Sequence, residues 1–389
     1  TPSHKWADEQ GAEFVEVGNW MRAQWFPKAG DKTWRDSVDR EVTKTRQSVG
    51  VCDVSTLGKI DIKGKDAAEF LNKIYSNPFA KVPVGRVRYG LMLREDGICY
   101  DDGTTARLAE NHFVMTTTTA NAVLVYRNME FARQCLFPDL DVHIISTTDQ
   151  WAQFAVAGPN SRAVLSKIID NVDMSNDGFP FMACSDVTVC GGTPGRLFRI
   201  SFSGELAYEV AVPARYGDAL IREIISAGEE FNITPYGTEA LGVMRIEKGH
   251  VTGAELNGQM TAFNINMNNM ISTKKDSIGS VLSRREVMVA DDQVRLVGVK
   301  TIKKSDSLSS GAHFLAENDK PTTQNDQGWI TSVCYSPHFE QHIGLGFLER
   351  GHERHGEVLR AWDGIRGTDV LVEIVSSHMY DPEGGLQRG

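Results

Sequence analysis

Four carboxylates in two short stretches are the side chains of this sequence best suited to acid–base chemistry or ligand binding. Asp101 and Asp102 stand side by side, directly before Gly103. Neighbouring side chains on a strand point to opposite faces of a sheet, so only one of these acids can enter a given pocket. One acid is therefore a candidate for a buried working carboxylate, and the other is predicted to cap a turn before Gly103, since Asp-Asp-Gly is ordinary turn sequence.

Glu205 and Glu209 form the second pair of carboxylates. On a strand they would share one face with Ala207 and Ala211, and the small alanine side chains would leave room beside the acids. A carboxylate in that position can accept two N–H donors from the edge of a flat ligand. The alternative interpretation is a solvent-exposed strand face that binds nothing.

A predicted β-hairpin positions the first pair of acids. Leu91 and Leu93 alternate with other residues as on a strand, residues 95–97 (Glu-Asp-Gly) have turn chemistry, and residues 98–100 return as a second strand. The hairpin thus places Asp101 and Asp102 at the end of the return strand.

The rest of the chain reads as a mixture of helices and strands in two regions. Strands and helices succeed one another irregularly up to residue 285, which predicts an α+β fold. After a change of composition near residues 285–293, short strands separated by glycine turns predict a small C-terminal β-barrel. The aromatic-rich residues 1–35 are expected to be irregular, and residues 34–49 to form a helix.

Composition excludes several classes of function. The 389 residues carry a formal net charge of −10, which argues against non-specific nucleic-acid binding and against docking on an anionic membrane. No run of 18 apolar residues is present, so no membrane span is expected. The six cysteines form no Cys-x-x-Cys pair, which favours a reducing cytoplasm and no metal site. The sequence has no Gly-x-Gly-x-x-Gly motif after a strand and no Walker A loop, so no dinucleotide or ATP site is expected.

Five separated stretches carry a recognisable pattern: Gly50-Val-Cys-Asp53-Val-Ser55, the hairpin from Tyr89 to Asp102, Ala155-Val-Ala-Gly-Pro-Asn160, Ser203-Gly-Glu205 with Tyr208-Glu209, and Met244-Arg-Ile-Glu247. In this order they resemble the aminomethyltransferase (T-protein) family of the glycine cleavage system. Further stretches, which include Gly85-Arg-Val-Arg-Tyr-Gly90 and Ile233-Thr-Pro-Tyr236, are similar to one branch, the C-terminal half of the alpha subunit of heterotetrameric sarcosine oxidase. Leu241, where T-proteins carry an arginine, also favours that branch.

This resemblance implies a three-domain folate-binding fold closed by a C-terminal β-barrel. Residues 1–285 would form the folate-binding region, as two α+β subdomains with the second, roughly 57–148, inserted in the first. Residues 290–389 would form the barrel. The implied cofactor is tetrahydrofolate. The implied catalytic acid is Asp101, and the implied cofactor-binding residues are Glu209, Tyr89, Phe202 and Met92.

The function implied is that of a tetrahydrofolate-dependent one-carbon transferase module in the cytoplasm. It would accept the one-carbon unit of oxidised sarcosine, or of a related N-methyl amine or its imine, and give 5,10-methylene-tetrahydrofolate. Because the sequence shows no flavin motif, flavin-containing oxidase subunits would be its partners. Two alternatives stay open: a stand-alone demethylase of a methylated amine or sulfonium compound, and a non-catalytic folate-binding subunit.

Overall fold

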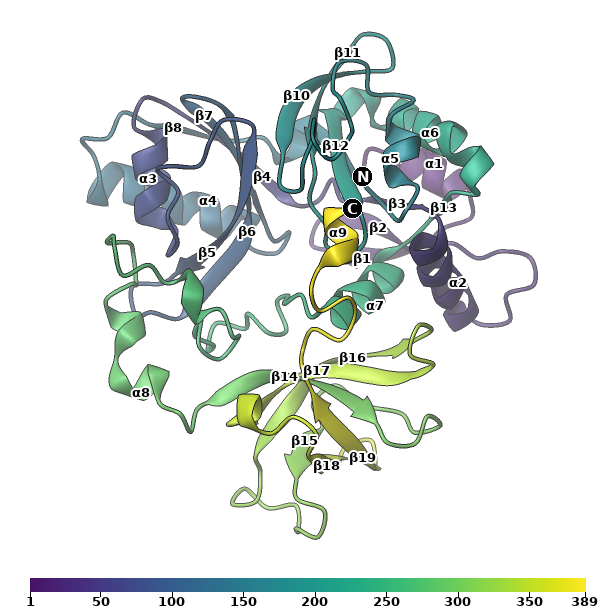
Figure 1. The fold of residues 1–389 in the computed structure, drawn as a ribbon, viewed down its shortest axis with the longest axis vertical. Coiled ribbons are helices and arrows are strands. Elements are labelled where there is room, and N and C mark those ends of the chain that lie inside the picture. The colour runs from purple at the N-terminus through teal and green to yellow at the C-terminus, as the bar shows by residue number, and fades with distance from the viewer. The chain divides into compact units, whose positions relative to one another are not determined.

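The computed structural model describes residues 1–389 and divides into two compact units (Figure 1). The first unit contains Thr1–Met92, Asp101–Leu241 and Gly384–Gly389, and the second contains Leu93–Tyr100 and Gly242–Glu383. The division at residues 285–290, with 57–148 as an insertion, stays a prediction.

A six-stranded sheet forms the centre of the first unit. One of its faces packs under three helices, α1 (His4–Glu9), α5 (Ser161–Leu165) and α6 (Gly217–Gly228), around a core that includes Phe154 and Tyr208. Successive side chains along a strand point to opposite faces, so the residues next to Phe154 and Tyr208 in the sequence face the other side of the sheet. In sheet order the strands are β10 (Cys184–Val189), β11 (Thr193–Phe198), β12 (Ala207–Pro213), β9 (Trp151–Ala157), β3 (Gly50–Asp53) and β13 (Thr234–Pro235).

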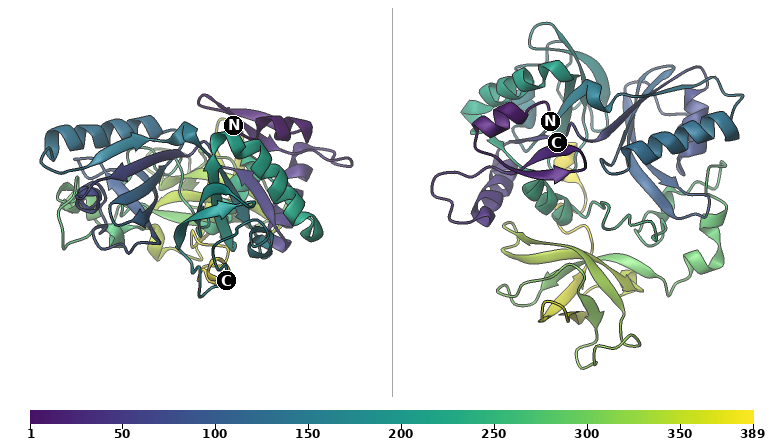
Figure 2. Two further views of the ribbon diagram at one scale, coloured as in Figure 1. Left: turned by 90° about the horizontal axis from the view of Figure 1, so that it is seen from above. Right: turned by 180° about the vertical axis from the view of Figure 1, so that it is seen from behind.

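A five-stranded sheet forms the other half of the first unit. Helices α3 (Ala67–Ile74) and α4 (Ala122–Phe131) cover one face of this sheet, and α4 lies in front of the strands when the molecule is seen from behind (Figure 2). A side chain at Gly58 would collide with Ala122 of α4, which marks the closeness of that packing. In sheet order the strands are β5 (Arg86–Leu93), β6 (Cys99–Ala109), β7 (His112–Thr117), β4 (Gly58–Lys63) and β8 (His143–Ser146).

The predicted hairpin is confirmed, but the predicted turn at Asp101-Asp102-Gly103 is wrong. Strands β5 and β6 are joined by a turn in which Gly97 has a positive φ of 91°. Strand β6 then continues through both acids and Gly103. A β-carbon at Gly103 would lie 2.1 Å from the carbonyl oxygen of Thr116, so this glycine permits the close approach of β7.

The uncovered faces of the two sheets meet each other. Val87, Ala106 and Val114 of the five-stranded sheet pack against Cys184, Phe198 and Ile200. Beside this apolar contact, Arg196 of β11 donates two hydrogen bonds to Asp61 of β4, at 3.1 and 2.8 Å. The inter-sheet face of the first unit thus holds charged side chains as well as an apolar contact.

The first 50 residues are more regular than predicted. Residues 1–35 contain α1 and a hairpin of β1 (Glu13–Val17) and β2 (Trp20–Trp25), so the expectation of an irregular segment is wrong. The predicted helix is confirmed as α2 (Trp34–Gln47). Thr33 and Asp36 form a capping box at its start, in which each side chain bonds the other's backbone N–H.

The second unit contains the predicted C-terminal barrel, which is confirmed as a closed barrel of six strands (Figure 1). Its interior is filled by a cluster that includes Phe314, Leu348 and Ile374. The strands in order around the barrel are β14 (Val294–Thr301), β17 (Gln341–Glu349), β16 (Gly328–Ser336), β15 (His313–Leu315), β18 (Val358–Asp363) and β19 (Thr368–Val375). The remaining helices are α7 (Thr238–Lys248), which begins in the first unit, α8 (Glu286–Val289) and α9 (Gly385–Arg388).

Candidate functional site

Glu209 lies on the inter-sheet face of β12, opposite to the helix-covered core. Its register partners are Ala155 on β9 and Phe198 on β11. Ala207 and Ala211 lie two residues away on the same face and are buried. The predicted arrangement of a carboxylate between small side chains is thus present in the structure.

The Glu209 carboxylate is buried but only partly satisfied. The side chain of Gln153 donates a hydrogen bond to Oε2, and Oε1 accepts no hydrogen bond from the protein. Burial raises the pKa of Glu209, while the bond from Gln153 and the charge of Lys59 act in the opposite direction. The carboxylate therefore keeps acceptor capacity for a ligand, on a face where only 8% of the residue is exposed to water.

Lys59 of β4 is a charged residue of this face that sequence reasoning did not select. Its ammonium group is buried and donates to the carbonyl oxygens of Ser55 at 2.8 Å and Leu57 at 3.0 Å. Burial lowers its pKa to about 8. A signal was present in the sequence: Lys59 and Asp61 alternate with isoleucines, a pattern that places both charges on one face of a strand.

The two adjacent acids of β6 point to opposite faces of the five-stranded sheet. Asp102 shares its face with Thr104 and Ala106, which is the face that meets the six-stranded sheet. It is partly exposed and accepts a hydrogen bond from the Tyr89 hydroxyl at 2.6 Å. Loss of hydration raises the pKa of Asp102 to about 7, although the bond from Tyr89 opposes this.

Asp101 lies on the helix-covered face and is fully buried. It accepts hydrogen bonds from the hydroxyl of Thr118 at 2.8 Å and from the side-chain amide of Asn121 at 3.2 Å, just before α4. Burial raises the pKa of Asp101 to about 6, while these bonds lower it. The structure therefore places Asp102, and not Asp101, on the face of the five-stranded sheet that meets the sheet of Glu209.

The three other residues predicted to bind the cofactor lie in different surroundings. Tyr89 shares a face of β5 with Val87 of the inter-sheet cluster, and its hydroxyl is engaged by Asp102. Met92 is buried and points to the opposite face of that strand. Phe202 follows β11 and is 38% exposed, so its ring is accessible.

Glu205 does not share the strand face of Glu209, contrary to the sequence-based prediction. It precedes β12 and forms a buried ion pair with Arg46 of α2, at 2.6 Å. The same guanidinium also donates to the carbonyl oxygen of Ser203. Glu205 thus fastens the loop before β12 to α2, which is a structural role.

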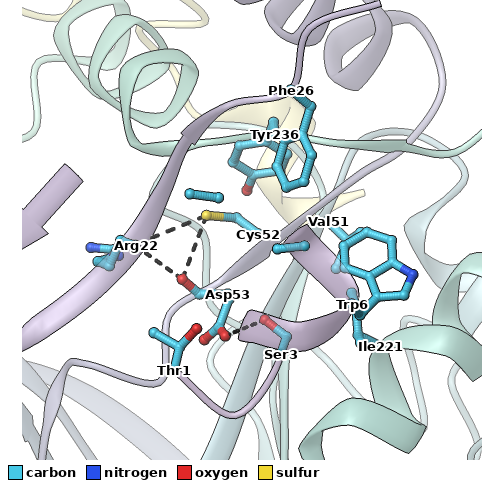
Figure 3. Close-up of a pocket in the computed structure, with 12 residues that line it drawn as sticks. Thr1, Ser3, Trp6, Arg22, Phe26, Val51, Cys52, Asp53, Ile221 and Tyr236 are labelled. Atoms are coloured by element: carbon cyan, nitrogen blue, oxygen red, sulfur yellow. Dashed lines mark hydrogen bonds between the residues drawn. The ribbon is translucent and has the colours of Figure 1, made fainter. Parts of the chain in front are cut away.

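A small pocket beside β3 is filled by ordinary structural contacts (Figure 3). Arg22 of the N-terminal hairpin donates to the carbonyl oxygen of Asp53 at 3.1 Å, and Ser3 donates to the carboxylate of Asp53 at 2.5 Å. Burial raises the pKa of the adjacent Cys52 thiol to about 12, so this thiol is inert at neutral pH. These contacts fix the hairpin on the sheet.

Taken together, the inter-sheet face carries a buried acceptor, a buried cation and a second acid. Glu209 can accept N–H donors, Lys59 supplies a compensating charge, and Asp102 can hold or release a proton near neutral pH. No group of three or more His, Cys, Asp or Glu side chains is placed to hold a metal ion.

Comparison with known proteins identifies the class to which this fold and face belong. A family model described as the GCVT N-terminal domain matches residues 3–275, and one described as the glycine cleavage T-protein C-terminal barrel domain matches residues 295–381. The chain therefore belongs to the aminomethyltransferase (glycine cleavage T-protein) family, a family of transferases, as its motifs indicated.

The relatives include both branches of that family. The sarcosine oxidase alpha subunit of Rhizobium meliloti (strain 1021) is 50% identical over 98% of this chain and 39% of its own length. That of Corynebacterium sp. (strain P-1) is 43% identical over 100% of the chain and 40% of its own length. An aminomethyltransferase of Listeria welshimeri is 27% identical over 98% of the chain and 97% of its own length. The chain thus spans about two fifths of the sarcosine oxidase subunits that it matches.

A solved structure has the same fold. The glycine cleavage system aminomethyltransferase T from Bartonella henselae matches with a TM-score of 0.84 and 20% identity, covering 98% of each chain. The predicted T-protein-like α+β fold with its C-terminal barrel is confirmed. No helix of the structure has the length and apolar character needed to cross a membrane.

Proposed function

We propose that this chain is a tetrahydrofolate-dependent one-carbon transferase module whose folate site is the inter-sheet face. The observation that carries the proposal is the buried Glu209 carboxylate, which lies among alanines and has one oxygen without a hydrogen bond from the protein. Family membership supports the same cofactor.

The residues of this face fit a pterin. The edge of a pterin offers an amino group and a ring N–H side by side, and a carboxylate such as Glu209 can accept both. The small side chains of Ala207 and Ala211 beside Glu209 would leave room for a flat ring. Phe202, which has an accessible ring, and Tyr89 supply aromatic faces within the same unit. Met92 stays a predicted contact, although its side chain points away from Tyr89.

When bound, tetrahydrofolate would supply the two nitrogens that take up a one-carbon unit. The chain's own contribution is binding, orientation and proton handling. Glu209 would fix the pterin edge, and the Tyr89 hydroxyl would hold the Asp102 carboxylate in one orientation through its bond to Oδ2. Asp102, with a pKa of about 7, could take a proton on its carboxylate or return it at neutral pH.

For the working acid we propose Asp102 in preference to Asp101, the residue that the resemblance indicates. The face that Asp102 shares with Ala106 and the hydrogen bond from Tyr89 support this choice. Asp101 is fully buried, and both of its carboxylate oxygens already accept hydrogen bonds, Oδ1 from Thr118 and Asn121 and Oδ2 from the backbone N–H of Thr118. Its proposed role is to hold the start of α4 on the sheet.

The proposed donor is the oxidation product of sarcosine or of a related N-methyl amine. Free formaldehyde would add its carbon to the two folate nitrogens with loss of one water. The methylene-iminium form of the oxidised amine would do so with release of the amine and a proton, and both routes give 5,10-methylene-tetrahydrofolate. The high identity to sarcosine oxidase alpha subunits supports this donor class and flavin-containing oxidase subunits as partners. A stand-alone demethylase and a non-catalytic folate-binding subunit are the alternatives.

A donor comparison with the purified chain separates these three functions. With tetrahydrofolate present, we expect no methylene-tetrahydrofolate from sarcosine alone. We expect product above the spontaneous background when a flavin-dependent amine oxidase supplies the oxidised amine. Product from a methylated amine or sulfonium compound without the oxidase would instead establish the demethylase. Folate binding without acceleration by any donor would establish the non-catalytic subunit.

A further inference from the structure

Lys59 is held in a fixed position next to the proposed folate site. Two of its three ammonium donors are taken by backbone carbonyls, those of Ser55 and Leu57. Ser55 is in turn bonded to β9, because its hydroxyl accepts the backbone N–H of Gln153 at 2.9 Å. The side chain of Gln153 then donates to Glu209. A continuous chain of contacts therefore links the lysine to the carboxylate.

Few charged groups surround Lys59 and Glu209. Glu209, Asp53 and Asp149 are the carboxylates that act on Lys59. Lys59 is the charged group that acts on Glu209, and Glu209 in turn helps to raise the pKa of the buried Tyr236 hydroxyl. Lys59 is thus the cation that compensates the charge of Glu209, and no ion pair within 4.0 Å joins them.

We propose that Lys59 is a positioning residue that acts through Glu209: its tethered charge keeps the carboxylate ionised without occupying the oxygens that bind the pterin. This inference rests on the proposed function. A lysine free to move would close onto Glu209 and compete with the ligand for its oxygens. The two backbone carbonyls hold the ammonium group back, so its charge acts at a distance through a poorly hydrated interior.

The test is a calorimetric titration of the chain with folinic acid from about pH 6 to pH 9. In Lys59→Met the loss of the positive charge raises the pKa of Glu209 further, and a rise of about one unit lowers the ionised fraction about 10-fold below that pKa. We therefore expect binding of Lys59→Met to be weaker by up to about 10-fold at the acidic end of the range, and this gap to close toward pH 9. There Lys59 of the wild type has lost its proton too, since its pKa is about 8.

Three further variants make the outcome specific. Lys59→Arg keeps the charge and should bind within about 3-fold of wild type across the range. Lys63→Met removes a lysine from the exposed end of the same strand and should change nothing. In a Glu209→Gln background, Lys59→Met should no longer alter the pH profile, because the group on which it acts cannot ionise.

The pH dependence of the Lys59→Met effect also decides whether the inference fails. A loss of affinity in Lys59→Met that is the same at every pH would show a purely structural role. If this variant does not fold, Lys59→Gln retains N–H donors for the two carbonyls and must show the same pH-dependent loss. Absence of folinic acid binding by the wild type would instead remove the proposed function, a failure that the variants cannot imitate.

Discussion

Replacing Asp102 with Asn is expected to lower the rate of one-carbon transfer at saturating folate by roughly 100-fold or more, the usual contribution of a positioned acid or base. The amide keeps the shape of the side chain and the bond to Tyr89 but cannot take up a proton. Because Glu209, on the other sheet, is unchanged, the affinity for folinic acid should stay within a few-fold of wild type. The measurement is the initial rate of methylene-tetrahydrofolate formation with an oxidase supplying the donor.

The neighbouring acid provides a matched control. Asp101→Asn makes the same chemical change one residue earlier, on the helix-covered face, where Thr118 and Asn121 are its partners. We expect it to retain most of the transfer rate and to unfold at a lower temperature than wild type. The reverse result, with transfer abolished in Asp101→Asn and retained in Asp102→Asn, would return the catalytic role to the residue that the resemblance indicated.

Asp61→Asn is expected to lower the free energy of unfolding by about 3–5 kcal/mol, which is the cost of leaving a buried charge without its partner. The carboxylate of Asp61 accepts two hydrogen bonds from Arg196 and one from Thr147, and His112 Nε2 lies 2.9 Å away. The Arg196 guanidinium also lies 4.0 Å from the centre of the Trp151 ring, so it cannot move into water without losing that contact. Urea unfolding of wild type and variant measures the difference.

Asp186 offers the control for this pair, since its carboxylate lies 4.0 Å from the same guanidinium but its side chain is 71% exposed. Asp186→Asn should cost less than about 1 kcal/mol, as exposed ion pairs do. An equal loss in both variants would contradict the importance assigned to burial. Burial opposes ionisation of Asp61, yet His112 and Arg196 more than offset this and hold its pKa below the usual range.

The sign of the pH dependence follows from that depressed pKa. A carboxylate whose pKa is lower in the folded state contributes stability above its unfolded pKa, and this contribution is lost as the pH falls through the folded value. Wild-type stability should therefore fall on acidification below about pH 4. The free energy of unfolding of Asp61→Asn should fall less on acidification, because the contribution of the Asp61 carboxylate is already absent.

Local patterns were sufficient to predict the hairpin, the helix α2, the barrel and the alanine-flanked Glu209. Each of these depends on periodicity or turn chemistry within a dozen residues. The pattern failed at Gly103, which reads as a turn residue but sits in β6 because Thr116 approaches too closely for any side chain. Nothing in residues 101–103 themselves reports that neighbouring strand.

Long-range pairing explains the other differences between sequence and structure. The partner of Glu205 is Arg46, far away in the chain, so an acid that looked available for a ligand is in fact neutralised. Which of Asp101 and Asp102 faces Glu209 depends on which side α4 covers, and a single sequence does not specify that side. Lys59 escaped notice because a lysine on a strand usually lies in water, whereas here both sheet faces are covered.

The measurement that tests the central claim most directly is calorimetric titration of wild type and Glu209→Gln with folinic acid at neutral pH. Loss of two charge-assisted hydrogen bonds, partly replaced by one amide oxygen, predicts binding at least about 10-fold weaker in the variant. Glu205→Gln, which changes the ion-paired acid four residues earlier, should bind within a few-fold of wild type if it folds. Equal affinity of wild type and Glu209→Gln would contradict the account and place the folate site elsewhere.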